Sequence, residues 1–128
     1  MRRVALAALG ILLMAASAGS PEISYTNAQA ADGRFLFYQH CAECHGGNLG
    51  GNFGPALAGP DARMQWESGA SVYAYVSVQM PHGAPGTLKK QEYVDIMAFL
   101  LQQHGHRAGS QPLDVRMLKS DVKPIGGR

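Results

Sequence analysis

The stretch Cys41-Ala42-Glu43-Cys44-His45 contains the only two cysteines of the 128-residue chain, and a histidine follows the second one directly. Three kinds of site compete for this pattern. A structural zinc site needs four ligands, and only scattered histidines are left to complete one: His40, His82, His104 and His106. A redox-active disulfide is expected after a strand in a strand-helix-strand pattern, which the sequence lacks. Covalent haem attachment is favoured, because Cys-x-x-Cys-His is its attachment pattern.

The chemistry of haem attachment requires this spacing. The thiols of Cys41 and Cys44 add to the two vinyl groups on one edge of the porphyrin, and His45 is then carried beneath the ring to the iron. We therefore expect one haem c as the cofactor, with His45 as the first iron ligand.

The first 18 residues have the features of a secretory leader. The basic pair Arg2-Arg3 precedes an apolar run of 12 residues, 4–15, which is shorter than the roughly 20 residues that span a bilayer. Cleavage is expected after Ala18, with a second small-residue pattern ending at Ala30 as the alternative; an uncleaved membrane anchor is the competing interpretation. The leader predicts a periplasmic protein without stable membrane insertion after cleavage.

Composition and charge narrow the class of protein. The chain has eleven Lys and Arg residues and nine Asp and Glu residues, and it contains no block of like charge. This balance argues against a nucleic-acid-binding protein. The length, together with 16 glycines and 7 prolines, predicts one compact domain with long irregular segments.

Apolar periodicity predicts helices at about 33–40, 72–79 and 89–103. Asp32 and Ser71 are expected to cap the first two helices. The third has Tyr93, Ile96, Phe99 and Leu100 at the helical period, with Gly105 available for a left-handed turn at its end.

Irregular segments separate these helices. Residues 46–59 hold six glycines in 14 positions, too many for a helix, and Pro81 begins a turn-rich strap over 81–86. The polar tail is interpreted as a surface extension. The expected division of the chain is a leader, an N-terminal extension, one domain and a C-terminal surface extension: 1–18, 19–31, 32–105 and 106–128.

Four elements in order make the chain resemble class I c-type cytochromes from Asp32 to about Gly105. They are the attachment site at 41–45, Gly54-Pro55-Ala56-Leu57, Met80-Pro81, and Ala98-Phe99-Leu100-Leu101. More narrowly, the segment from Met80 to Leu88, followed by Glu92-Tyr93, is similar to small periplasmic cytochromes associated with quinoprotein dehydrogenases.

The resemblance implies an all-α, cytochrome c-like fold in which a small helical domain surrounds one covalently attached haem. It implies that the first and last helices cross, with Gly33 and Phe37 facing the region of Phe99 and Leu100. It also implies that the Pro55 carbonyl accepts a hydrogen bond from the ring of His45, which fixes the tautomer of that ligand; a simple turn-forming proline is the other interpretation.

The second iron ligand has to be chosen among the methionines. Met97 lies inside a predicted helix, where a core role is favoured, Met117 lies in the tail, and Met64 follows His45 by only 19 residues. Met80 ends a helix and enters a proline-rich strap, and the resemblance assigns it the ligand role. His82 or an open iron position is the alternative.

Aromatic residues are candidates for the haem surroundings. Trp66 is either a donor to a haem propionate or a packing residue. Phe53, Tyr73 and Tyr75 are candidates for the haem wall, with Tyr75 placed on the apolar helix face. We interpret the remaining histidines as surface residues: His40, His104 and His106.

The favoured function is electron transfer, because two protein ligands leave the iron no open position for a substrate. We expect a carrier that is not an enzyme, with a dehydrogenase, of the quinoprotein kind by resemblance, as electron donor. The acceptor is a respiratory partner such as a terminal oxidase or another cytochrome. The alternatives are a permanent cytochrome subunit of a dehydrogenase complex and a haem enzyme with an open sixth position.

Overall fold

The computed structural model describes residues 22–126. Its elements are the α-helices α1 (Asn27–His40), α2 (Ala42–His45), α3 (Gly69–Gln79), α4 (Lys90–Gln103) and α5 (Val115–Ser120), and the 3-10 helix η1 (Arg63–Trp66). Within the described part of the chain no strand is present, only an isolated bridge between Ser68 and Pro124. The expected all-α class is therefore confirmed.

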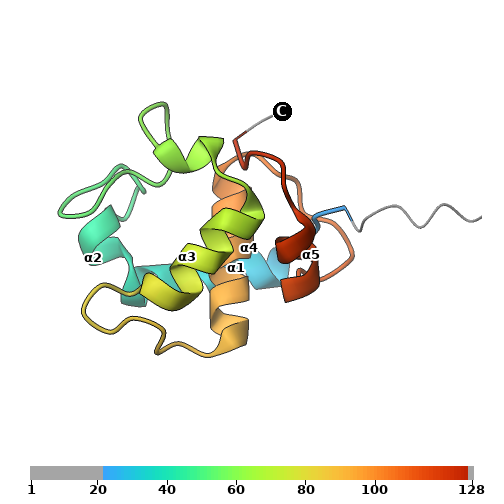
Figure 1. Cartoon of the computed structure of the whole chain (residues 1–128), viewed down its shortest axis with the longest axis horizontal. Helices are drawn as coiled ribbons and strands as arrows, with labels where there is room; N and C mark the ends of the chain where they lie inside the picture. Colours follow the sequence, from blue (N-terminus) through green and yellow to red (C-terminus); the bar gives the residue numbers. More distant parts are fainter. Residues whose placement is uncertain (1–21, 127–128) are drawn as a thin grey trace, which may run out of the picture.

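The crossing of α1 and α4 forms the centre of the molecule (Figure 1). Gly33 allows the close approach, because a Cβ atom at this position would lie 1.7 Å from the carbonyl oxygen of Asp95 on α4. One turn along, the rings of Phe37 and Phe99 meet with their centroids 5.3 Å apart. Phe37 thus faces Phe99 as expected, whereas Gly33 meets the backbone at Asp95.

Two helices begin earlier than the sequence predicted. Thr26 caps α1 through a capping box with Gln29, so the helix starts before Asp32. Ser68 caps α3, and its hydroxyl accepts a hydrogen bond from the amide of Ser71, the residue expected to be the cap. In both cases an earlier side chain satisfies the free amides of the first turn, and the helix extends back to it.

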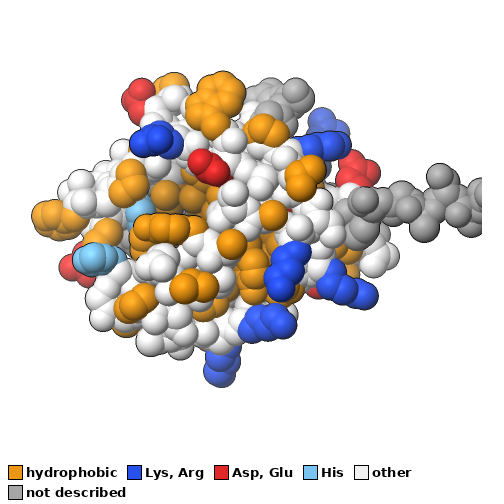
Figure 2. Space-filling view, in the orientation of Figure 1, with side chains coloured by type: hydrophobic (Ala, Val, Ile, Leu, Met, Phe, Trp, Pro, Cys, Tyr) orange, Lys and Arg blue, Asp and Glu red, His pale blue; other side chains and the backbone are white. Residues whose placement is uncertain are grey.

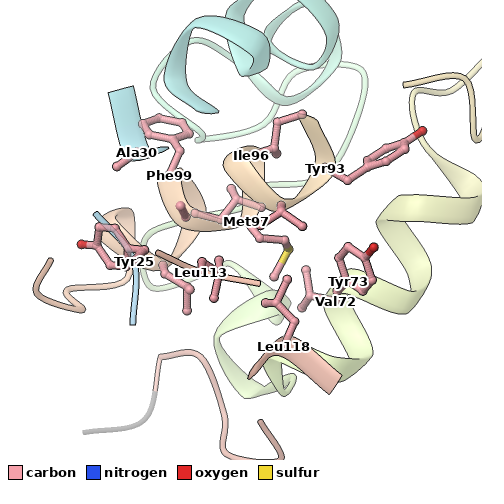
Figure 3. Packing of buried hydrophobic residues seen from close by; sticks show 14 of the residues in the cluster. Tyr25, Ala30, Val72, Tyr73, Tyr93, Ile96, Met97, Phe99, Leu113 and Leu118 are labelled. Atoms are coloured by element: carbon pink, nitrogen blue, oxygen red, sulfur yellow. The ribbon is translucent and has the colours of Figure 1, made fainter. Parts of the chain in front are cut away.

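Helix α4 follows the prediction closely. It ends at Gln103, and Gly105 adopts a positive φ of 87° just beyond it. Met97 is completely buried on α4, among the residues of the hydrophobic cluster in Figure 3, and has the core role that we expected.

The tail after α4 is part of the core rather than a surface extension. Leu113, Leu118 and Ile125 are fully buried, and Figure 3 shows Leu113 and Leu118 among the core side chains. The tail also joins the first turn of α1, because the Gln29 side chain accepts a hydrogen bond from the amide of Leu113 (2.7 Å) and donates one to its carbonyl (3.0 Å). The packed unit therefore extends beyond the expected limits of 32–105 at both ends.

The predicted leader, 1–18, lies outside the described residues. Of the helices in the described range, none is long and apolar enough to cross a membrane.

The burial of the tail generates a prediction about stability. Leu118→Ala should lower the free energy of unfolding by about 2–5 kcal/mol, because it leaves a cavity beside α3 in the core. Val122→Ala is the matched control. Val122 lies four residues from Leu118 and is 80% exposed, so truncating its side chain should change the free energy of unfolding by no more than about 0.5 kcal/mol. Denaturant unfolding followed by circular dichroism measures both. Equal stability of the two variants would contradict the core role of the tail.

Candidate haem-attachment site

The attachment motif forms a single helical turn at the end of α1. Cys41 ends α1 and begins α2, with its amide bonded to the carbonyl of Phe37 (2.8 Å). The amides of Cys44 and His45 both bond to the carbonyl of Cys41, at 3.2 and 2.9 Å. Side chains three positions apart on a helical turn face the same side, so Cys41 and Cys44 can both reach one edge of a flat group.

Cys41 and Cys44 form no disulfide with each other, and both are partly buried. Burial raises the pKa of the Cys41 thiol to about 11, and the charge of Cys44 adds to the shift. The surroundings of Cys41 therefore disfavour a charged sulfur. An uncharged sulfur, as a thiol or as a thioether, therefore suits this position.

His45 is held by one ring nitrogen and leaves the other available. The side chain is 8% exposed, and Nδ1 lies 2.8 Å from the carbonyl oxygen of Pro55. A carbonyl only accepts, so Nδ1 carries the proton and Nε2 presents its lone pair. Among the described residues the ring makes its hydrogen bond through Nδ1. This is the arrangement of a metal-ligating histidine with its orientation fixed by the backbone.

The glycine-rich loop folds back against the motif. The Gly54 amide bonds to the carbonyl of Cys44 (2.7 Å), and the Gly51 amide bonds to that of His45 (2.8 Å). A Cβ atom on Gly54 would lie 3.0 Å from Cε1 of His45, tighter than an ordinary contact. The lack of a side chain at this position therefore lets the backbone carry Pro55 to the imidazole.

Met80 is the methionine at the end of α3. It is partly buried with an extended backbone, and the chain continues from it into the strap. In the structure we extend the strap by one residue beyond the expected 81–86, to residues 81–87. Figure 1 shows the strap and α2 on the same side of the molecule, at the left of the view. Met64 and Met117 pack against the hydrophobic core instead.

The expected helix face of Tyr73 and Tyr75 needs correction. Trp66 is 74% exposed, and its role as a propionate donor or a packing residue stays a prediction. Tyr73 is 7% exposed and Tyr75 58%, which reverses the expected helix face. The structure buries Tyr73 together with Val72, on the side of α3 that packs against the core, and leaves Tyr75 outside. Phe53 is also exposed.

Two of the histidines interpreted as surface residues are partly buried and bonded. Nε2 of His104 lies 2.8 Å from the carbonyl oxygen of Leu57, which ties the end of α4 to the glycine-rich loop. Burial lowers the pKa of His104 despite that bond, with a smaller contribution from the charge of His106. His106 bonds to the carbonyl of Ile125 (2.7 Å), whereas His40 is exposed, as expected. Nothing in the periodicity of the sequence indicated these tertiary contacts.

Hydrophobic side chains gather over the part of the surface where α2 and α3 lie (Figure 2). A porphyrin is a large, mostly apolar plate and needs such a surface to cover it. The paired cysteines, the free Nε2 of His45 and this apolar surface therefore fit one haem c.

Comparison with known proteins supports the same cofactor. The family model described as cytochrome C oxidase, cbb3-type, subunit III matches residues 28–100. A chain of the sulfane dehydrogenase SoxCD from Paracoccus pantotrophus has a similar structure, with a TM-score of 0.64 and 25% identity over 97% of this chain and 70% of that one. The search of curated proteins found no match.

The attachment geometry and the family match agree on the cofactor. The protein carries one haem c, bound covalently through Cys41 and Cys44, as the sequence predicted. The family match spans more than half of the chain and includes most of the two helices that cross, the attachment motif and Met80. This chain therefore belongs to the cytochrome c oxidase, cbb3-type, subunit III family of c-type cytochromes.

Proposed function

We propose that this protein is a periplasmic, single-haem electron carrier that takes electrons from a dehydrogenase and passes them to a respiratory acceptor such as a terminal oxidase or another cytochrome. The observation that carries the proposal is the fixed imidazole of His45, whose Nδ1 is bonded to the Pro55 carbonyl while Nε2 is available. Haem c supplies an iron that gains and loses one electron.

The proposed iron ligands are His45 and Met80. Met80 is suited to be the second iron ligand because it directly follows α3. The end of α3 lies on the same side of the molecule as α2 (Figure 1), whereas Met97 is buried in the core. A thioether raises the reduction potential relative to a second imidazole. With both positions filled by protein atoms, the site favours electron transfer over catalysis.

Pro55 completes the proposed site by orienting the imidazole. Its carbonyl accepts the Nδ1 proton, which fixes the ring plane and makes Nε2 a better donor to a metal. Proline suits the position because it needs no partner for an amide hydrogen and holds the loop rigidly.

A dehydrogenase is the proposed electron donor. The similarity to a chain of a sulfane dehydrogenase supports this class of partner, and the segment from Met80 to Leu88 is the basis for a quinoprotein dehydrogenase in particular. The same similarity supports a second candidate function, a permanent cytochrome subunit of a dehydrogenase complex.

The proposed periplasmic location rests on the predicted leader and on the attachment of haem outside the cytoplasm. The contacts at the start of the described chain support cleavage after Ala18 rather than after Ala30. Cleavage at the later position would remove Tyr25 and Gln29, which hydrogen-bond the tail at Gly109 and Leu113.

The first prediction from this proposal concerns attachment. Cys41→Ser or Cys44→Ser should reduce the yield of stable holoprotein, because each removes one thioether and a small domain depends on its cofactor for part of its core. Haem staining of denaturing gels measures covalent attachment in cells that have the maturation machinery. Wild-type protein without covalent haem under these conditions would overturn the proposal.

The second prediction concerns the second iron ligand. Met80→Ala should keep the haem attached but remove the weak sulfur-to-iron absorption band of the oxidised protein and lower its reduction potential. Met64→Leu and Met97→Leu are the controls and should leave that band unchanged. Loss of the band in Met97→Leu, with retention in Met80→Ala, would contradict the ligand assignment.

The third prediction concerns docking of the donor. Few charges lie near the attachment site and strap: Glu43 is exposed on α2, and Lys89 and Lys90 follow the strap. Because salt screens charge steering, stopped-flow reduction by a quinoprotein dehydrogenase should change little between low and moderate ionic strength. The double change of both lysines to Glu should alter the rate only a few-fold. A fall of the reduction rate by orders of magnitude on addition of salt would contradict the expectation that charge contributes little to docking.

A further inference from the structure

Tyr93 connects the core to the strap. It lies on α4 with its ring buried in the hydrophobic cluster, and Figure 3 shows its hydroxyl pointing away from the rest of that cluster. The hydroxyl donates a hydrogen bond to the carbonyl oxygen of Met80 (2.7 Å) and accepts one from the amide of Leu88 (3.3 Å). One buried hydroxyl therefore holds the residues at both ends of the strap.

The other hydrogen bonds of the strap are internal. The Gly86 amide bonds to the carbonyl of Met80 (3.0 Å), and Thr87 and Pro81 each bond to Ala84. These bonds give the strap its shape but do not fix it to the core. Among the described residues, Tyr93 supplies the side-chain hydrogen bonds that join Met80 and the strap to another element.

Apart from Tyr93, Met80 is held by the bond of its amide to the Val76 carbonyl (3.2 Å) and Leu88 by packing against the core, while the backbone between them is weakly restrained. Gly83 and Gly86 adopt positive φ angles of 91° and 70°, and most side chains of the strap are exposed. Glycines leave many conformations open to a free segment, so a bond at each end restricts the positions that Met80 can adopt.

The hydroxyl, rather than the ring, is the feature of Tyr93 that packing leaves unexplained. A phenylalanine would fill the same space in the cluster without a polar atom to satisfy. A buried hydroxyl is costly unless it is hydrogen-bonded, and here both bonds go to the residues that flank the strap.

We infer that Tyr93 is a positioning residue for the thioether of Met80: by holding the Met80 carbonyl and the Leu88 amide, it keeps Met80 where the sulfur can bind iron. The inference rests on the proposed role of Met80 as second iron ligand. A thioether is a weak ligand for ferric iron, so its occupancy depends on how well the backbone presents it.

Competition with imidazole tests the inference. Imidazole is titrated into the oxidised holoprotein, and loss of the sulfur-to-iron band reports displacement of the thioether. Tyr93→Phe should raise the apparent affinity for imidazole about 2- to 10-fold, the change that corresponds to loss of an ordinary hydrogen bond.

Tyr25→Phe is the matched control. Tyr25 is also a buried tyrosine, and its hydroxyl donates to a backbone carbonyl, that of His106 in the tail. This variant should lower the stability of the fold while leaving imidazole affinity unchanged. A purely structural role of Tyr93 would make the two variants behave alike in the imidazole titration, and that result would overturn the inference.

The Met80→Ala background separates the inference from the proposed function. There the thioether is gone, so adding Tyr93→Phe should leave imidazole affinity unchanged. An equal rise in affinity with and without Met80 would show that Tyr93 acts on haem access, and would overturn the inference while the ligand assignment stands. Survival of the sulfur-to-iron band in Met80→Ala would overturn the ligand assignment itself.

Discussion

The close approach of α1 to α4 at Gly33 is the constraint on which the rest of the structure depends. With no side chain at this position, the backbone of α1 lies directly against the Asp95 carbonyl, and Phe37 meets Phe99 one turn further on. The attachment motif follows α1 without a break, and Leu88 and Lys89 connect the strap to α4. The crossing therefore positions the two chain segments that carry His45 and Met80.

Both proposed iron ligands are held through backbone carbonyls rather than by packing alone. The imidazole of His45 donates to the Pro55 carbonyl, and the Met80 carbonyl accepts from Tyr93. Each arrangement joins an irregular, glycine-containing segment to a helix. Loops of this composition can pass close to a porphyrin edge, but they retain their position only where such bonds restrain them.

The two ends of the described chain form one packed layer beside this centre. Gln29 bonds to the backbone of Leu113, Gly109 bonds to Tyr25, and Leu118 is buried in the core. The tail also supports the start of α3, where the Asp121 carboxylate accepts a hydrogen bond from the amide of Gly69 (3.1 Å). A segment with few apolar residues thus stabilises the helix that ends at Met80.

The sequence by itself determined the chemistry and the local structure. The spacing of Cys41, Cys44 and His45 specifies haem attachment, and the period of α4 and the turn at Gly105 are local properties of the chain. Tertiary structure alone decided which helix faces and segments are buried. Tyr73 rather than Tyr75 faces the core, Trp66 is exposed, and Leu113 and Leu118 are buried. The hydroxyl of Tyr93 finds its partners only in the folded chain. The physical reason is that burial depends on contacts between segments far apart in the sequence. The local pattern of residues within one segment does not indicate which distant segment will pack against it.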